Sequence, residues 1–265
     1  IASGSVEAIA MTEPEAGSDV GSLTTKAERV DGGFVINGQK VFISNAHISD
    51  HVLVVCRTTK GASKHEGLTM IWVPREVEGM EIVPIETMGG RETNTLYFTD
   101  CVAPESAVLG EVDQGWTQLM AGLNVERLIL AATMLGIAQR AFDDLLLYVK
   151  ERRQFDRPIG SFQALQHRIS DLATDLQAAR LMTHWVATLT DEDPDRMLPK
   201  EASMVKLFVT EVAKRTTLEG MQMMGGYGYS SEYDMERLVR SSLVSTIYGG
   251  TSEIQRTIIA KTLGL

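Results

Sequence analysis

The sequence predicts a two-domain α+β protein in which an antiparallel β-barrel or β-sandwich is followed by a helical bundle. Short β-branched or alternating runs separated by turn signals fill residues 1–112. After Gly115 the apolar residues recur every three to five positions, which is the spacing of helices with one buried stripe. A chain of 265 residues also agrees with about two domains of roughly 150 residues each. We therefore predict domains at 1–112 and 113–265.

The first domain is expected to hold about seven strands. Turn signals such as Asp31-Gly32-Gly33 and Asn37-Gly38 separate the runs. No helical pattern lies between them, and strands at this turn-like spacing favour an antiparallel barrel or sandwich. The expected strands cover residues 6–11, 26–30, 34–43, 51–58, 68–74, 80–85 and 95–102.

The second domain is expected to consist of three long helices and a shorter pair. Its first helix carries an apolar stripe from Trp116 to Val149, and its second helix a stripe from Leu165 to Leu189. Prolines interrupt the acidic loop that follows. The remaining helices are expected at 202–224, near 232–244 and at 252–263, which together indicate a helical bundle packed on the β domain.

Composition limits the classes of protein to consider. Hydrophobic residues make up 44% and charged residues 23% of the chain, ordinary globular values that exclude disordered and low-complexity classes. The chain has no run of eighteen apolar residues and no signal-peptide pattern at its start, so we expect neither a membrane span nor a secretion signal. A net charge of -10 without a basic stripe argues against nucleic-acid binding.

Metal and disulfide chemistry are not expected either. The two cysteines, Cys56 and Cys101, provide neither a disulfide framework nor a four-ligand zinc site, and they suit a reducing compartment. His47 and His51 are four apart, but they flank a polar loop without a third ligand nearby.

Two segments of the β domain could approach a ligand. Residues 9–19, which combine hydroxyls, a proline turn and Gly17, follow a strand and suit close contact with a planar or phosphorylated ligand. A strand that runs into a surface turn is the plainer interpretation. Phe42 and Ser44 are two apart on one face of a strand, which suits stacking on a ring and one hydrogen bond, although Phe42 alone is more often a core residue.

Three segments of the helical domain carry similar signals. Residues 148–157 hold four basic side chains in an acidic protein, which suits a pyrophosphate or simply a solvated helix end. Gly225-Gly226 permits a left-handed helix cap with close backbone approach, or only the cap. Gly249-Gly250 precedes Thr251 or Ser252 as the N-cap of a helix, whose unpaired N–H groups can receive a carbonyl oxygen or a phosphate.

Taken together, in this order and spacing, the five segments resemble the acyl-CoA dehydrogenase family of flavoproteins. The resemblance runs through TEPEAGSD, NGQKVFISN, ERRQFDRPIG, MMGGYGY and IYGGTSEIQR and covers essentially the whole chain. It implies an antiparallel β-barrel middle domain followed by a C-terminal four-helix bundle, with FAD held between them and a neighbouring subunit contributing, commonly in a homotetramer. The family also has an N-terminal helical domain in front of the barrel. Because this sequence starts without it and without methionine, we expect a truncated or partly observed product rather than a variant that has lost the domain.

The resemblance also assigns cofactor-binding positions residue by residue. Phe42 and Ser44 match the aromatic and the hydroxyl that lie against the flavin ring, with Ile43 between them, and Ser18 matches a position that also faces the CoA ligand. The other positions implied to contact FAD are Ile9, Met11, Thr12, Gly17, Arg152, Gln154, Gln163, Gln222, Gly225, Gly226, Thr251 and Glu253.

The position of the catalytic base departs from the commonest pattern of the family. Many members carry a glutamate directly after the tyrosine of the last motif, where this sequence has Gly249. A subset that resembles isovaleryl-CoA and long-chain enzymes carries the base on the first bundle helix, where this sequence has Glu126. The gain of a glutamate on the helix and its loss from the loop argue for retained catalysis.

Glu126 is therefore the expected base. It lies among Leu123, Val125 and Leu128 on a helix expected to be mostly buried, and desolvation should raise its pKa towards the range of a general base. The plainer interpretation is a surface carboxylate, solvated or paired with Arg127.

The substrate-side positions follow from the resemblance as well. It implies an oxyanion site at the backbone N–H of Gly249 together with a flavin ribityl hydroxyl, and a glycine supplies that N–H as well as a glutamate would. Arg127, Gly250 and Ser18 match substrate-binding positions. Ser241 replaces an aspartate that often follows the arginine matched by Arg240, and nothing in the sequence explains this substitution.

The expected function is FAD-dependent α,β-dehydrogenation of an acyl-CoA thioester to a trans-2-enoyl-CoA. The reaction combines abstraction of the α-proton with transfer of the β-hydride to flavin N5, and electron-transfer flavoprotein is the expected acceptor. The alternatives are a flavin oxidase or monooxygenase on the same fold, a catalytically silent subunit of a hetero-oligomer, or a DNA-associated relative, against which the acidic charge argues. The motifs do not define the acyl group, although the helix-borne base favours branched or long chains. A bacterial cytoplasm and a mitochondrial matrix both suit such an enzyme.

Overall fold

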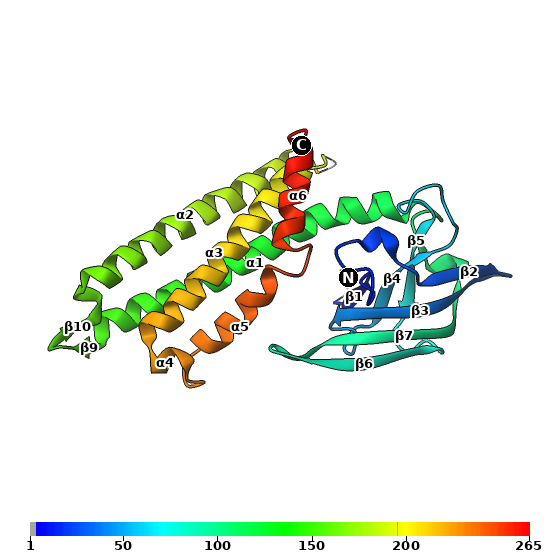
Figure 1. Cartoon of the computed structure of the whole chain (residues 1–265). Coiled ribbons are helices and arrows are strands. Elements are labelled where there is room, and N and C mark those ends of the chain that lie inside the picture. The colour runs from blue at the N-terminus through cyan, green and yellow to red at the C-terminus, as the bar shows by residue number, and fades with distance from the viewer. Residues whose placement is uncertain (1–3, 195) are drawn as a thin grey trace. The chain divides into compact units, whose positions relative to one another are not determined.

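The computed structural model describes residues 4–194 and 196–265, which form two compact units, Ile1–Met120 and Ala121–Leu265. The first unit is a β unit and the second is helical (Figure 1). Helix α1, Gly115–Glu151, begins in the first unit and continues into the second. The α+β class predicted from the two hydrophobic periods is therefore confirmed.

The strands of the β unit lie close to their predicted positions. The alternation of buried and exposed residues in the sequence matches strands in six of the seven cases to within three residues at each end, and the seventh begins earlier than expected. A short eighth strand was not predicted. The strands are β1 (Glu7–Ala10), β2 (Lys26–Val30), β3 (Gly33–Ser44), β4 (His51–Arg57), β5 (Leu68–Pro74), β6 (Met80–Thr87), β7 (Gly90–Pro104) and β8 (Val108–Leu109).

These strands form one sheet that is not closed. The order is β6-β7-β3-β2-β4-β5-β8, with β1 also paired to β4, and among the described residues no pairing joins β6 to β8. The pairings β1–β4 and β2–β4 are parallel, whereas the others are antiparallel. The closed antiparallel barrel of the prediction is therefore not what the pairings form. The alternation of hydrophobic residues predicts where strands lie but not which strands pair. The loop at residues 11–25 connects β1 to β2 in such a way that both strands run parallel to β4.

The Asn37-Gly38 signal was misinterpreted as a separator of strands. It lies inside β3, where the register against β7 shifts between Ile36 and Gly38. Gly38 has φ +149, and a Cβ at this position would lie 2.6 Å from Thr25 Oγ1. The glycine therefore allows a β-bulge with close backbone approach rather than a hairpin turn.

The helical unit contains three long helices and two shorter ones that pack against the third. Apolar side chains from the three long helices form its core, among them Ala131, Leu176 and Val209. Figure 1 shows α2 and α3 side by side, with α5 and α6 along α3. The helical character predicted for this domain is confirmed, whereas the arrangement as a four-helix bundle is not. The helices are α1, α2 (Gln163–Glu192), α3 (Pro199–Met224), the unpredicted turn α4 (Gly226–Tyr229), α5 (Met235–Ser245) and α6 (Ser252–Thr262).

A small hairpin between α1 and α2 was not predicted. Strands β9 (Arg153–Gln154) and β10 (Arg157–Pro158) pair antiparallel across Phe155 and Asp156, which have φ values of 51 and 63. Two successive positive φ values are typical of a type I′ turn.

Helix α1 is long and apolar enough to cross a membrane by length and composition alone. Core helices of soluble proteins can pass the same test. The expected absence of a membrane span stays a prediction.

Candidate active site

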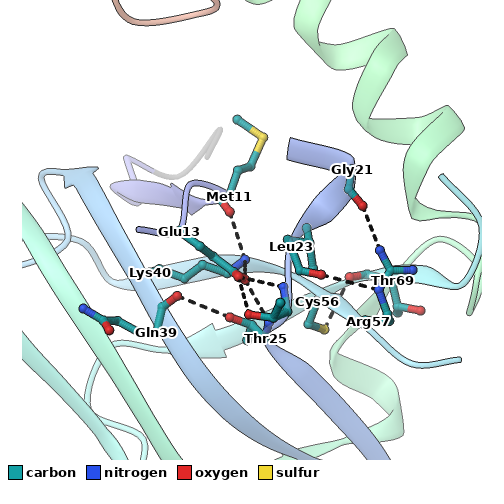
Figure 2. Close-up of polar contacts among 11 residues, drawn as sticks. Met11, Glu13, Gly21, Leu23, Thr25, Gln39, Lys40, Cys56, Arg57 and Thr69 are labelled. Carbon is teal, nitrogen blue, oxygen red and sulfur yellow. Dashed lines mark hydrogen bonds and ion pairs between the residues drawn. The ribbon is translucent and has the colours of Figure 1, made fainter. Parts of the chain in front are cut away.

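The loop between β1 and β2 carries four of the predicted cofactor-binding or substrate-binding residues, and a buried ion pair fixes its start (Figure 2). Lys40 on β3 donates from Nζ to the Met11 carbonyl oxygen at 2.9 Å and to Glu13 Oε1 at 2.9 Å. The side chains of Lys40 and Glu13 are 0% and 4% exposed. The backbone N–H of Val41 donates to the Thr12 carbonyl oxygen at 2.8 Å. The loop is thereby held against β3.

The carboxylate of Glu13 organises the far end of the same loop. It accepts hydrogen bonds from the backbone N–H groups of Thr24 and Thr25 at 2.6 and 2.9 Å. Burial alone would raise the pKa of Glu13, but the Lys40 ammonium and these hydrogen bonds lower it to about 2. Burial lowers the pKa of Lys40, and the Glu13 charge opposes that shift. Both residues belong to the quoted motifs, yet no role was predicted for either of them.

A second anchor comes from Arg57 on β4. Its guanidinium donates to the carbonyl oxygens of Gly21 at 2.9 Å and Leu23 at 3.4 Å (Figure 2). The loop is consequently fixed near both of its ends by buried or half-buried cations.

Phe42 and Ser44 are both exposed on β3, so the plainer interpretation of Phe42 as a core residue is wrong. Phe42 is 63% exposed, whereas Ile43 between them is 2% exposed and belongs to the core. The register of β3 against β7 shifts between Lys40 and Ile43, and Phe42 has φ 59, a left-handed value that is unusual for an aromatic residue. A large exposed side chain on a strained bulge is typical of a functional position rather than of a core position.

The other predicted positions of the β unit lie in two places. Ile9 projects from the exposed side of β1 and is 46% exposed. Met11 and Thr12 are half-buried at the start of the loop, and Gly17 and Ser18 are exposed further along it.

The helical unit places the predicted base beside the glycine pair. Glu126 is half-buried on α1, and the next turn of the same helix carries Leu130, whose Cδ1 lies 2.5 Å from where a Cβ of Gly249 would be. Burial raises the pKa of Glu126, and the charges of Arg127 and Lys206 oppose that shift. Burial also raises the pKa of Tyr248, with the Glu126 charge adding to the effect. Because their charges affect one another's pKa values, Glu126, Lys206 and Tyr248 lie close enough to form one cluster.

Arg127 is almost fully buried, at 7% exposure. Its guanidinium donates to Asn124 Oδ1 at 3.2 Å, while its Nε is buried without a partner among the described residues. A buried donor without a partner is costly, so this atom is a candidate contact for a bound ligand.

The glycine pair forms a turn with left-handed backbone at both positions. Gly249 and Gly250 have φ values of 61 and 84. Their amide N–H groups donate to no other group in the part of the chain that the structure describes. Thr251 is the N-cap of α6 and accepts a hydrogen bond from the Ile254 N–H at 3.3 Å, which confirms the predicted cap. Glu253 is exposed in the first turn of α6.

The predicted diphosphate and adenosine positions lie elsewhere in the helical unit. Gly225 ends α3 with φ 63 and ψ -140, so the predicted glycine cap is present, but its backbone is not in the left-handed helical conformation. The Arg152 guanidinium lies 5.4 Å from the centroid of the Tyr227 ring. A cavity of about 780 Å³ brings four of the predicted residues together with aromatic side chains, and its lining includes Arg152, Gln154, Gly225, Gly226, Tyr148, Phe155, Phe162 and Tyr227.

Two of the predicted diphosphate and adenosine residues do not line this cavity. Gln163 begins α2 and is exposed, although its neighbours Phe162 and Ala164 line the cavity. Gln222 is exposed near the end of α3, next to the lining residue Met223. Thr251 and Glu253 belong to the glycine turn instead, so the structure divides the predicted residues of this unit between two places.

Lys206, Tyr248 and Gln255 were missed in the sequence. Tyr248 and Gln255 belong to the segment IYGGTSEIQR but were given no role, whereas Lys206 lies on α3 outside every quoted segment. Only the fold brings Lys206 and Tyr248 close to Glu126. A lysine in the apolar stripe of a helix was the available signal. Among the described residues, no three histidine, cysteine, aspartate or glutamate side chains converge as a metal site would require.

Comparisons with known proteins find similarity to acyl-CoA dehydrogenases over nearly the entire chain. Residues 8–101 match the family model of the acyl-CoA dehydrogenase middle domain, and residues 113–264 match that of the acyl-CoA dehydrogenase C-terminal domain. A mitochondrial 2-methylacyl-CoA dehydrogenase of Solanum tuberosum is 39% identical over 261 residues, which cover 97% of this chain and 63% of that protein. A mitochondrial short/branched chain specific acyl-CoA dehydrogenase of Rattus norvegicus is 41% identical, with 95% of this chain and 58% of that protein covered.

The solved structures give the same result. The crystal structure of an acyl-CoA dehydrogenase from Geobacillus kaustophilus matches with a TM-score of 0.93 at 36% identity, covering 98% of this chain and 69% of that chain. The chain thus spans about 63% of the length of the Solanum tuberosum relative.

Proposed function

Because the chain belongs to the acyl-CoA dehydrogenase family, we propose that it catalyses FAD-dependent dehydrogenation of an acyl-CoA thioester to a trans-2-enoyl-CoA. The observation that supports this most is the pairing of a half-buried glutamate, Glu126, with a glycine turn that offers unpaired N–H groups. We also propose 1–112 and 113–265 as the domains of this chain.

Glu126 is the proposed base. The proton α to a thioester carbonyl is weakly acidic, so its removal needs a carboxylate with a raised pKa that is still ionised. Burial raises the pKa of Glu126, whereas Arg127 and Lys206 favour its charged form. The opposing effects suit a group that must be ionised before the reaction and protonated after it.

The turn at Gly249 is the proposed site for the thioester carbonyl. As the α-proton leaves, negative charge develops on the carbonyl oxygen, and a preorganised N–H stabilises that charge. The Gly249 N–H has no hydrogen-bond partner among the described residues. Arg127, Gly250 and Ser18 are proposed as further substrate contacts.

The residues present suit FAD. An aromatic side chain exposed at 63% on a strained bulge, Phe42, with Ser44 beside it, can take a flavin ring, and Arg152 and Gln154 in an aromatic-lined cavity can take the nucleotide part. When bound, FAD supplies the acceptor for the β-hydrogen and its electron pair. The further residues proposed to hold it are Ile9, Met11, Thr12, Gly17, Ser18, Ile43, Gln163, Gln222, Gly225, Gly226, Thr251 and Glu253.

The proposed partners follow from the family. Electron-transfer flavoprotein is the proposed acceptor of the electrons, and a homotetramer is the proposed assembly. Relatives named for short, branched and 2-methylacyl groups support a short branched acyl chain as the first substrate to test. A bacterial cytoplasm and a mitochondrial matrix are both retained as proposed locations.

The test is anaerobic flavin reduction in the full-length protein loaded with FAD. Straight-chain and branched acyl-CoA thioesters are mixed with the protein, and loss of flavin absorbance is followed. We expect at least one of them to bleach the flavin and Glu126→Gln to abolish the bleaching. Glu192→Gln is the matched control, because Glu192 is exposed at the end of α2. Unchanged bleaching in Glu126→Gln refutes the assigned base.

The same preparation separates the alternatives. A silent subunit shows no bleaching with any thioester. A flavin oxidase or monooxygenase is bleached, but its reduced flavin reacts fast with oxygen, whereas a dehydrogenase passes its electrons to electron-transfer flavoprotein.

A further inference from the structure

Lys206 is a fully buried cation whose contact with the glycine turn has no part in the proposed reaction so far. It lies on α3 and is 0% exposed. Its Nζ donates to the carbonyl oxygen of Gly250 at 2.9 Å, and its Cε lies 3.9 Å from the position that a Cβ of Gly249 would occupy. A buried lysine is costly unless it is paired, so this contact with the glycine turn calls for an explanation.

Gln255 on α6 also binds the backbone of the glycine turn. Its Nε2 donates to the carbonyl oxygens of both Gly249 and Gly250 at 2.9 Å, and its side chain is also 0% exposed. The two glycines would otherwise be the most mobile residues of this segment. With both carbonyls fixed from α3 and α6, the orientation of the peptide groups, and hence of their unpaired N–H groups, is fixed too.

The charge of Lys206 acts on Glu126 as well. The ionisable groups that act on Glu126 are Arg127 on α1, Lys206 on α3 and Tyr248 in the glycine turn. Of these, Arg127 and Lys206 lower the pKa of Glu126, against the effect of burial.

Lys206 itself has cations and anions around it. Burial and, next to it, the Arg127 charge lower the pKa of Lys206 to about 8, although the charges of Glu211, Glu126 and Glu253 oppose the shift. At neutral pH the side chain is therefore still mostly charged and can act on Glu126.

We propose that Lys206 is a positioning residue of the dehydrogenation: it orients the Gly249–Gly250 turn towards the thioester carbonyl and holds Glu126 in its ionised form. Gln255 shares the first task and not the second. The proposal rests on the proposed function, because both tasks presuppose Glu126 as the base and the turn as the carbonyl site.

The first test is the pH dependence of flavin reduction in the full-length, FAD-loaded protein. Lys206→Met removes the charge and the donor, and Lys206→Gln removes the charge alone. Loss of the positive charge raises the pKa of Glu126, so the acidic limb of the reduction rate moves to higher pH in both variants. In Lys206→Arg, which keeps the positive charge, the acidic limb of the reduction rate should return to the pH of the unsubstituted protein. Lys214→Met is the matched control, because Lys214 lies on the same helix and, in the part of the chain that the structure describes, makes no hydrogen bond to the turn.

The second test separates carbonyl positioning from general binding. In a Glu126→Gln background, isovaleryl-CoA is bound without turnover and is compared with the thioether analogue that lacks the carbonyl. We expect Lys206→Met to weaken binding of the thioester about threefold to tenfold, the effect of one hydrogen bond, and to leave binding of the thioether unchanged. Amide hydrogen exchange of residues 246–256 should also become faster, and it should not change in Lys214→Met.

The outcomes distinguish this proposal from the proposed function. Full activity of Glu126→Gln refutes the assigned base, whereas the absence of bleaching by any thioester in the unsubstituted protein refutes the proposed function. If Glu126→Gln is inactive, while Lys206→Met leaves the acidic limb in place and weakens both ligands equally, Lys206 is only a structural residue and the proposal is wrong. If Lys206→Met does not fold, the same two readings are taken from Lys206→Gln.

Discussion

Replacement of Lys40 by methionine should destabilise the β unit strongly. Methionine fills a similar volume but removes the ammonium that contacts Glu13 Oε1 and the Met11 carbonyl oxygen, each at 2.9 Å. The Glu13 side chain, 4% exposed, then remains buried without its counter-ion. Removal of one partner from a buried ion pair typically costs about 3–5 kcal/mol. We therefore expect Lys40→Met to lower the free energy of unfolding by about that amount at pH 7.

The pH dependence gives this prediction a second signature. The pKa of Glu13 is lowered from 4.5 to about 2 in the folded protein. A lowered folded-state pKa contributes stability that is fully present above the unfolded value of 4.5 and is lost as the pH falls towards 2, in total about 3 kcal/mol. In Lys40→Met the burial of Glu13 is no longer opposed by the ammonium. Its pKa rises, and the contribution disappears at a higher pH.

The assay must follow the β unit separately, because a chain of two units need not unfold in one step. Urea denaturation of the full-length protein, detected by hydrogen exchange in peptides of β1–β4, does this. The control is Lys26→Met: the Lys26–Glu28 pair is 3.8 Å long and highly exposed, and such pairs contribute about 0–1 kcal/mol.

Two results would contradict the reasoning about this ion pair. Lys40→Met could cost no more than Lys26→Met, or the double variant Glu13→Gln/Lys40→Met could be no more stable than Lys40→Met alone. Removal of both charges should recover part of the loss, because no unpaired charge is then buried.

Two further substitutions test backbone positions of the site. Gly249→Ala places a Cβ at φ 61 and 2.5 Å from Leu130 Cδ1, so calorimetry should show a loss of about 1–2 kcal/mol, whereas Gly122→Ala on α1, where nothing lies within 4 Å of the new Cβ, should be neutral or stabilising. Phe42→Gly relieves the left-handed φ of 59 at a side chain that is 63% exposed, so the apoprotein should gain up to about 1 kcal/mol while its flavin content falls, as measured by denaturant unfolding and absorbance.

The secondary structure could largely be predicted from the sequence. Lys26–Val30 and Leu68–Pro74 are strands with the predicted bounds, and the long helices differ by a few residues, because hydrophobic periodicity is a local property. The pairing of the strands is not local. Both β1 and β2 pair parallel to β4 because of the path of the loop at residues 11–25 between them. Lys40 and Arg57 hold this loop through its backbone carbonyl oxygens, and the spacing of the sequence does not indicate these contacts.

The candidate site was predictable only where the motifs carry it. Glu126, the glycine turn and the Thr251 cap followed from short segments, and the cavity collects Arg152 and Gln154 as the charged cluster suggested. Lys206 belongs to no such segment, and Gln255 lies in the last of them without any role that the sequence indicated. Their side chains meet the turn because α3 and α6 pack together, and that contact is a product of tertiary structure.

The position of the acid and the identity of residue 249 are physically linked. Leu130 lies one turn after Glu126 on α1, and its Cδ1 occupies the space that a Cβ at residue 249 would need. The left-handed φ of 61 disfavours any side chain there, and Lys206 and Gln255 hold the turn in that conformation through its carbonyls. The helix that carries the acid therefore also excludes an acid from the turn. A glutamate at residue 249 would have to displace the Leu130 side chain and change the backbone conformation that Lys206 and Gln255 hold. Moving the acid from position 126 to position 249 would therefore require a change at Leu130 as well as at the two positions themselves.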